Sequence, residues 1–114
     1  MKSNFELRKA LVGLGISSNM QAYHYILETI NILKKQQIHT NITFIYDLLA
    51  KKYNTSKCSV ERTIRYAIIK SCKEKDILKK IYGHTPENSV FLHDLYFNFD
   101  VIKKTIEENL KNDR

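Results

Sequence analysis

Apolar residues recur along most of the chain at the three- and four-residue steps that are typical of amphipathic helices. A first helix is predicted from about Asn4, and Gly13 and Gly15 are expected to end it. The polar residues at 17–19 then offer side-chain oxygens that can cap a second helix. The apolar stripe of this second helix consists of Met20, Tyr23, Ile26, Leu27, Ile30 and Leu33.

The same periodicity predicts two more helices, over 42–53 and about 57–72, with only a short break between them. Asparagine tolerates the left-handed conformation and Ser or Thr can cap the next helix, so the Asn-Thr-Ser sequence at 54–56 should form this break. The side chains expected to face inward are Ile45, Leu48 and Leu49 in the first helix and Val60, Ile64, Ala67, Ile68 and Ser71 in the second. A short strand over 38–45 stays an alternative, because this segment is rich in β-branched residues.

The C-terminal third is predicted to hold a short helix over 76–82, a loop containing Pro86, and one long helix. Apolar residues in the long helix repeat at steps of three and four, which favours one helix over two: Leu92, Leu95, Phe99, Ile102, Ile106 and Leu110. Other faces of this helix carry further apolar residues, namely Val90, Phe91, Tyr96, Phe97 and Val101. A helix that is apolar on several faces is either buried in its own core or shared with a partner, and self-association is the form of the second alternative that suits a regulator of paired sites.

These elements define an all-α fold, a single compact domain of five to six helices over residues 1–114. With Gly 3 and Pro 1, the chain lacks the turn residues of an all-β sandwich or barrel. The apolar runs are too short for a membrane span, and the first residues lack the apolar segment of a signal peptide. The short apolar runs therefore predict no membrane contact. The two cysteines form no disulfide framework, so the expected location is the cytoplasm.

The net charge of +7 is unevenly distributed. Residues 34–80 carry 12 basic and 4 acidic side chains, whereas residues 1–33 carry a net +1 and residues 81–114 a net −2. A basic block inside a folded domain is typical of a protein that binds a polyanion such as nucleic acid. The alternative is a lysine-rich face that is simply solvated.

The short connection between the third and fourth helices indicates a helix-turn-helix. Ala50 is a small residue where the two helices must approach, and Val60 and Ile64 should hold the second helix against the first. The residues left outside on the second helix are Lys57, Cys58, Ser59, Glu61, Arg62, Arg65 and Tyr66. Such a face suits the major groove of DNA, where a recognition helix contacts base edges with its first turns. An ordinary helical hairpin with a charged solvent face is the alternative.

A family resemblance is carried mainly by two neighbouring segments, AKKYNTS at 50–56 and VERTIRYAI at 60–68. They closely resemble the C-terminal DNA-binding effector domain of the sporulation-initiation master response regulator. Supporting segments are LGI at 14–16, QAYHY at 21–25 and PENSVFL at 86–92, so that the resemblance covers about residues 5–99. It implies a six-helix fold, sequence-specific binding of duplex DNA and control of transcription in spore-forming bacteria.

The resemblance also implies which residues contact DNA. Base reading is assigned to Glu61 and Arg62 and to the preceding position, where the family usually has a basic residue and this chain has Ser59. Arginine can donate two hydrogen bonds to guanine and a carboxylate can accept from cytosine, so the residue chemistry agrees. The backbone-contacting or flanking residues are Lys51, Lys52, Thr55, Ser56, Lys57, Cys58, Arg65 and Tyr66.

Further expectations concern what accompanies this domain. The family protein carries a phosphorylatable receiver domain, for which the sequence leaves no room, so phospho-aspartate switching is not carried over. Both a stand-alone regulator and an excised domain fit. The partners considered besides duplex DNA are a second copy on paired sites and RNA polymerase.

No cofactor, metal site or enzyme activity is predicted, because the four histidines are scattered and no catalytic or phosphate-binding motif is present. The alternative function is an interaction module that antagonises a related full-length regulator through its C-terminal helix.

Overall fold

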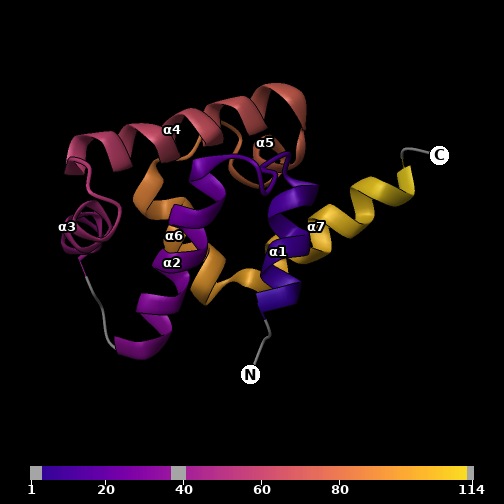
Figure 1. The fold of residues 1–114 in the computed structure, drawn as a ribbon. Helices are drawn as coiled ribbons and strands as arrows, with labels where there is room; N and C mark the ends of the chain where they lie inside the picture. The colour runs from indigo at the N-terminus through magenta and orange to yellow at the C-terminus, as the bar shows by residue number, and fades with distance from the viewer. Residues whose placement is uncertain (1–3, 37–40, 113–114) are drawn as a thin grey trace.

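The computed structural model describes residues 4–36 and 41–112, and every regular element within these ranges is an α-helix (Figure 1). The helices are α1 (Asn4–Gly13), α2 (Gln21–Gln36), α3 (Ile42–Lys52), α4 (Lys57–Glu74), α5 (Ile77–Tyr82), α6 (Asn88–Phe97) and α7 (Phe99–Asn112). The prediction of an all-α fold is confirmed. The described residues form seven helices, where five or six were predicted.

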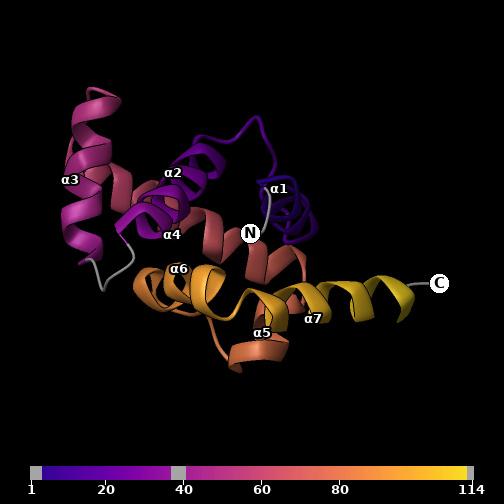
Figure 2. The same cartoon turned by 90° about the horizontal axis from the view of Figure 1, so that it is seen from below.

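Helix α4 is the longest element, with 18 residues, and it runs along one edge of the molecule (Figure 1). It packs on α2, α3, α5 and α6, while α1 packs on α2 and α7. Figures 1 and 2 place α3 at one end of the molecule and α7 at the other. Within the described ranges, no helix combines the length and apolarity needed to cross a membrane.

The apolar stripes predicted for α2 and α4 are buried, apart from Met20, which is partly buried against the core. In α3, Ile45 and Leu49 are buried as expected, but the prediction for Leu48 is wrong because its side chain is 37% exposed. Leu48 directly precedes Leu49, and adjacent helical residues point about 100° apart. The possible strand over 38–45 is also excluded for residues 42–45, which are helical, while residues 37–40 lie outside the described ranges.

Glycine ends two of the helices as the sequence predicts. After α1, Gly15 adopts φ 87°, the N–H of Ile16 donates to Leu11 O at 2.8 Å, and the N–H of Gly15 donates to Val12 O at 2.9 Å. This pair of bonds is the Schellman arrangement, which satisfies the last carbonyls of a helix. Gly83 ends α5 at φ 77° in the same left-handed region. Both positions favour glycine because a Cβ is disfavoured there.

The prediction of one long C-terminal helix is wrong, because the chain leaves the helical conformation at Asn98 (φ −126°, ψ 36°). Asn98 makes the last helical bond of α6, from its backbone N–H to Asp94 O, and its Nδ2 donates to Asp94 Oδ1 at 2.8 Å. Asparagine is one of the weaker helix formers, which favours a break at this position. The apolar residues keep their spacing through the break, and Leu92, Leu95, Phe99, Ile102 and Ile106 are all buried. A spacing pattern therefore identified the buried residues but not the change in helix direction.

The remaining apolar residues of this region divide between core and surface. Phe91 is fully buried and Tyr96 packs against the core, whereas Val90, Phe97 and Val101 are exposed. Leu110 was predicted to be buried but is 62% exposed, because the end of α7 extends past the other helices (Figure 2).

Candidate nucleic-acid interface

The turn between α3 and α4 has the geometry that the sequence predicts for it. Asn54 adopts φ 54°, and it is the sole non-glycine residue with positive φ in the described ranges. The N–H of Thr55 donates to Ala50 O at 2.9 Å and that of Asn54 donates to Lys51 O at 3.4 Å. These bonds again form a Schellman arrangement, here with asparagine in the left-handed position. The tight turn brings α4 directly against α3.

Helix α4 begins with a side-chain cap. Ser56 is extended (φ −98°, ψ 155°), and its Oγ accepts a hydrogen bond from the N–H of Ser59 at 3.0 Å. Its carbonyl accepts the first helical bond, from the N–H of Val60 at 3.1 Å. Serine is a preferred N-cap because its oxygen satisfies one of the free N–H groups of the first turn. The helix start is therefore fixed by Ser56, as predicted.

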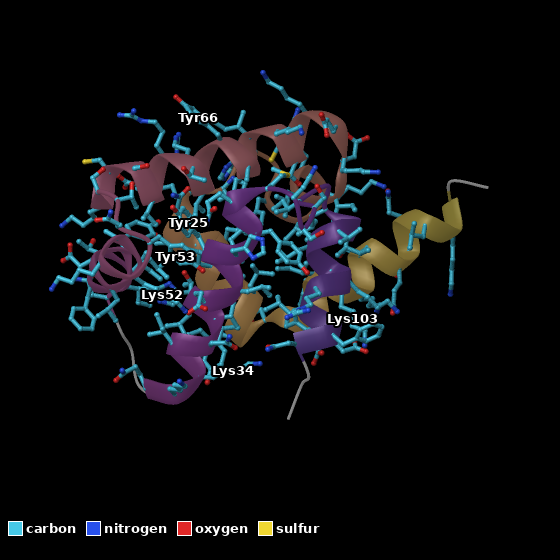
Figure 3. All side chains as sticks on the ribbon, in the orientation of Figure 1. Tyr25, Lys34, Lys52, Tyr53, Tyr66 and Lys103 are labelled. Atoms are coloured by element: carbon cyan, nitrogen blue, oxygen red, sulfur yellow. The ribbon has the colours of Figure 1, made fainter. Side chains whose placement is uncertain are left out.

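One face of α4 is buried and the opposite face is free. The buried residues are Val60, Ile64, Ala67, Ile68, Ser71 and Cys72. At 3.6 residues per turn, Arg62 lies almost opposite the middle of this stripe. Arg62 and Arg65 are exposed, and Tyr66 is 63% exposed and points away from the protein in Figure 3. The predicted outward residues of the helix thus share one surface.

The charge on this surface is available to an external ligand. In the part of the chain that the structure describes, no ion pair joins Arg62 or Arg65 to an acidic side chain. Lys51 is likewise exposed and outside these ion pairs. Arginine in this state offers several N–H donors to phosphate or to a base edge.

Two predicted backbone contacts are partly engaged within the protein. Lys52 Nζ contacts Glu28 Oε1 at 2.7 Å, so that its side chain is directed toward α2 (Figure 3). The hydrogen bond to Glu28 raises the pKa of Lys52. Lys57 Nζ lies 4.0 Å from Asp47 Oδ1, a long and exposed pair that has little energetic weight. Lys57 is thus more available to a ligand than Lys52.

The other predicted site residues lie at the start of the surface. Thr55, Ser56 and Cys58 are exposed, and Cys58 carries a free thiol. Ser59 is half-buried, and its part in the cap uses the backbone N–H rather than the hydroxyl. The structure therefore brings the predicted residues of α4 together, with Ser59 at the edge and Lys52 turned aside.

Hollows on the two sides of α4 extend this surface beyond the predicted residues. One hollow of about 270 Å³ lies between α4 and the start of α2, lined by Tyr66 and Lys70 together with Gln21. The second, about 770 Å³, is lined by Glu61, Arg65 and residues that begin α3 and α6. The sequence analysis did not place Gln21 or Lys70 beside this surface. For Gln21, the available signal was the polar start of α2, which has no acidic residue in its first turn.

Beside the second hollow, a buried amide joins three helices. Asn88, the first residue of α6, donates from Nδ2 to Tyr46 Oη at 3.1 Å and to the backbone oxygen of Glu61 at 3.0 Å. Burial is the main cause that raises the pKa of Tyr46, which is therefore a neutral phenol at physiological pH. Sequence reasoning did not identify Asn88 as a partner of α4.

No group of three or more His, Cys, Asp or Glu side chains suited to a metal ion occurs among residues 4–36 and 41–112.

Comparison with known proteins identifies the family of this chain. No solved structure gives a significant match. Residues 7–98 match the family described as "Sporulation initiation factor Spo0A C terminal", which is a family of DNA-binding transcription factor domains and not a known enzyme family. Because the match covers most of the chain, the chain belongs to the Spo0A C-terminal family of sporulation regulators.

Proposed function

We propose that this chain binds duplex DNA sequence-specifically and regulates transcription, with the first turns of α4 in the major groove. The observation that carries the proposal is the free face of α4, where Arg62 and Arg65 are exposed and make no ion pair with any acidic residue that the structure describes. A helix of this kind presents its N-terminal turns to base edges while neighbouring residues contact phosphates. Family membership supports the same reading.

Within this proposal, the contacts divide into two kinds. Glu61 and Arg62 read base edges, and Ser59 occupies a third reading position. Backbone contacts come from Lys51, Lys57, Arg65 and the start of α4, while Lys52 contributes once its bond with Glu28 is released. Self-association on paired sites and contact with RNA polymerase stay predictions, and the exposed Val90, Phe97 and Val101 are the residues that favour the first.

Salt dependence tests whether the basic surface binds a polyanion. The logarithm of the association constant should fall linearly with the logarithm of salt concentration, with a slope of about −0.9 for each phosphate neutralised. Fluorescence anisotropy with a labelled duplex at several salt concentrations gives this slope. Lys51→Ala should reduce its magnitude by about 1. The matched control is Lys104→Ala on α7, at the far end from α3, which should leave the slope unchanged. A wild-type slope of zero would remove the proposal.

A second prediction concerns Ser59, which replaces the basic residue usual in the family. Serine cannot form the bidentate guanine contact that discriminates by about 1 to 3 kcal/mol. Ser59→Arg should therefore raise the preference for guanine at one position by about tenfold. The Ser56 cap survives the change because it uses the backbone N–H of residue 59. Competition with single-base variants of the duplex measures the effect, and Ser59→Ala is the control that should gain no preference. Equal guanine discrimination by the native chain and by Ser59→Arg would assign that base to another residue.

A further inference from the structure

Asn88 is a polar side chain placed where the structure has almost no solvent. It is 8% exposed, and it lies at the junction of α6 with α3 and α4. Its two hydrogen bonds reach residues 42 and 27 positions earlier in the chain. A local capping role does not account for them, because neither acceptor belongs to α6.

The chemistry of the acceptors fixes how the amide is oriented. The backbone oxygen of Glu61 can only accept, so Nδ2 and not Oδ1 must face it. Nδ2 has two hydrogens, and the two bonds to Glu61 O and Tyr46 Oη use both. Asn88 Oδ1 is buried and accepts no hydrogen bond from the described residues. The side chain is therefore a donor at this site, and it holds one carbonyl of α4 and one hydroxyl of α3.

The carbonyl that Asn88 holds lies within the reading segment of α4. Glu61 is itself assigned to a base, and Arg62 follows it directly in the same helix. In the same turn, Val60 and Ile64 are buried in the core, and apolar packing is non-directional. The hydrogen bond to Glu61 O is directional, so it restrains the rotation and axial position of α4 in a way that apolar packing does not.

We infer that Asn88 is a positioning residue for DNA sequence recognition, which sets the base-reading turn of α4 without touching DNA. The inference rests on the proposed function. Base contacts require donor–acceptor distances within a few tenths of an ångström, whereas attraction to phosphates falls slowly with distance. Loss of the Asn88 bonds therefore weakens discrimination between sequences and leaves general attraction to DNA intact.

The experiment compares two duplexes. The preferred duplex is selected from a random pool with the native chain, and a scrambled duplex of the same length and composition serves as reference. The ratio of the two dissociation constants is measured for the native chain, Asn88→Ala and Asn88→Asp. In Asn88→Ala the ratio should fall about tenfold, within the range that one good base contact supplies, while the salt slope on the scrambled duplex stays the same. Asn88→Asp keeps the shape but cannot donate when ionised, so its ratio should fall at least as far.

A stability control separates positioning from simple destabilisation. Tyr82→Phe removes the bond from Tyr82 Oη to Asp94 Oδ2 (2.6 Å), which joins α5 to α6 and does not involve α4. Partial unfolding lowers the active fraction equally for both duplexes, so Tyr82→Phe should leave the ratio unchanged. If neither Asn88 variant folds, Tyr46→Phe removes one of the two acceptors, and it should lower the ratio by a smaller factor than that expected for Asn88→Ala.

The outcomes distinguish the inference from the function on which it rests. A native chain that binds both duplexes equally would contradict sequence-specific binding itself. A native chain that discriminates, with folded Asn88→Ala and Asn88→Asp that discriminate equally well, would overturn the positioning role alone. If Tyr46→Phe is the variant measured, an unchanged ratio of dissociation constants would likewise overturn the positioning role alone.

Discussion

Replacing Arg62 with alanine is expected to weaken binding to the preferred duplex by about 1 to 3 kcal/mol and to remove the preference at one base pair. Arg62 lies almost opposite the buried stripe of α4 and within its first two turns, so its side chain projects outward from the part of the helix that is proposed to enter the groove. Its guanidinium has no internal ion pair in the described ranges, and its loss leaves no buried charge behind. Dissociation constants on single-base variants of the duplex measure both effects.

The matched control for Arg62→Ala is Lys51→Ala. Lys51 is exposed on the last turn of α3. Lys51→Ala removes the same charge as Arg62→Ala, but it should weaken binding to every duplex by about the same factor, whatever the sequence. Because the overall charge change is identical, a difference between the two variants reports on base reading. If Arg62→Ala also weakened all sequences uniformly, Arg62 would be a phosphate contact and the reading role would belong elsewhere on α4.

Replacing Phe91 with alanine should lower the free energy of unfolding by about 3 to 5 kcal/mol. Phe91 is fully buried at 0% exposure, and α6 packs on α2, α4 and α7, so the cavity left by the ring cannot collapse easily. A loss of this size is a large part of the roughly 5 to 15 kcal/mol that stabilises a typical domain. Urea denaturation followed by circular dichroism gives the difference in midpoint and slope.

Val90→Ala is the control for this loss, because Val90 is the preceding residue of the same helix and is exposed. Its effect should stay within about 0.5 kcal/mol, the usual range for surface substitutions. A loss below about 1 kcal/mol in Phe91→Ala would mean that α6 repacks or that its ring is not in the core.

Local features of the chain could be predicted well because a few neighbouring residues determine them. Asn54 and Ser56 specify the turn between α3 and α4 by their own conformational preferences and hydrogen bonds. The same holds for Gly15 and Gly83, each of which ends a helix in the left-handed region. The outward face of α4 also follows from periodicity, since the burial of one stripe leaves the opposite face free.

Other features depended on where distant segments meet, and periodicity does not contain that information. The spacing from Leu92 to Ile106 is the same for one helix or two, so the break at Asn98 was missed. Lys52 was counted with the DNA-facing residues, and only the position of α2 reveals its bond to Glu28. The roles assigned to the residues of α4 on DNA remain predictions from chemistry and family resemblance.

The hydrogen bonds of Asn88 have a consequence for the order in which the chain becomes functional. Synthesis proceeds from the N-terminus, and the turn between α3 and α4 can close as soon as those residues emerge. Glu61 precedes Asn88 by 27 residues, so α4 lacks this restraint until α6 has been made and docked. A nascent or truncated chain that ends before residue 88 therefore lacks this restraint even though all residues of α3 and α4 are present.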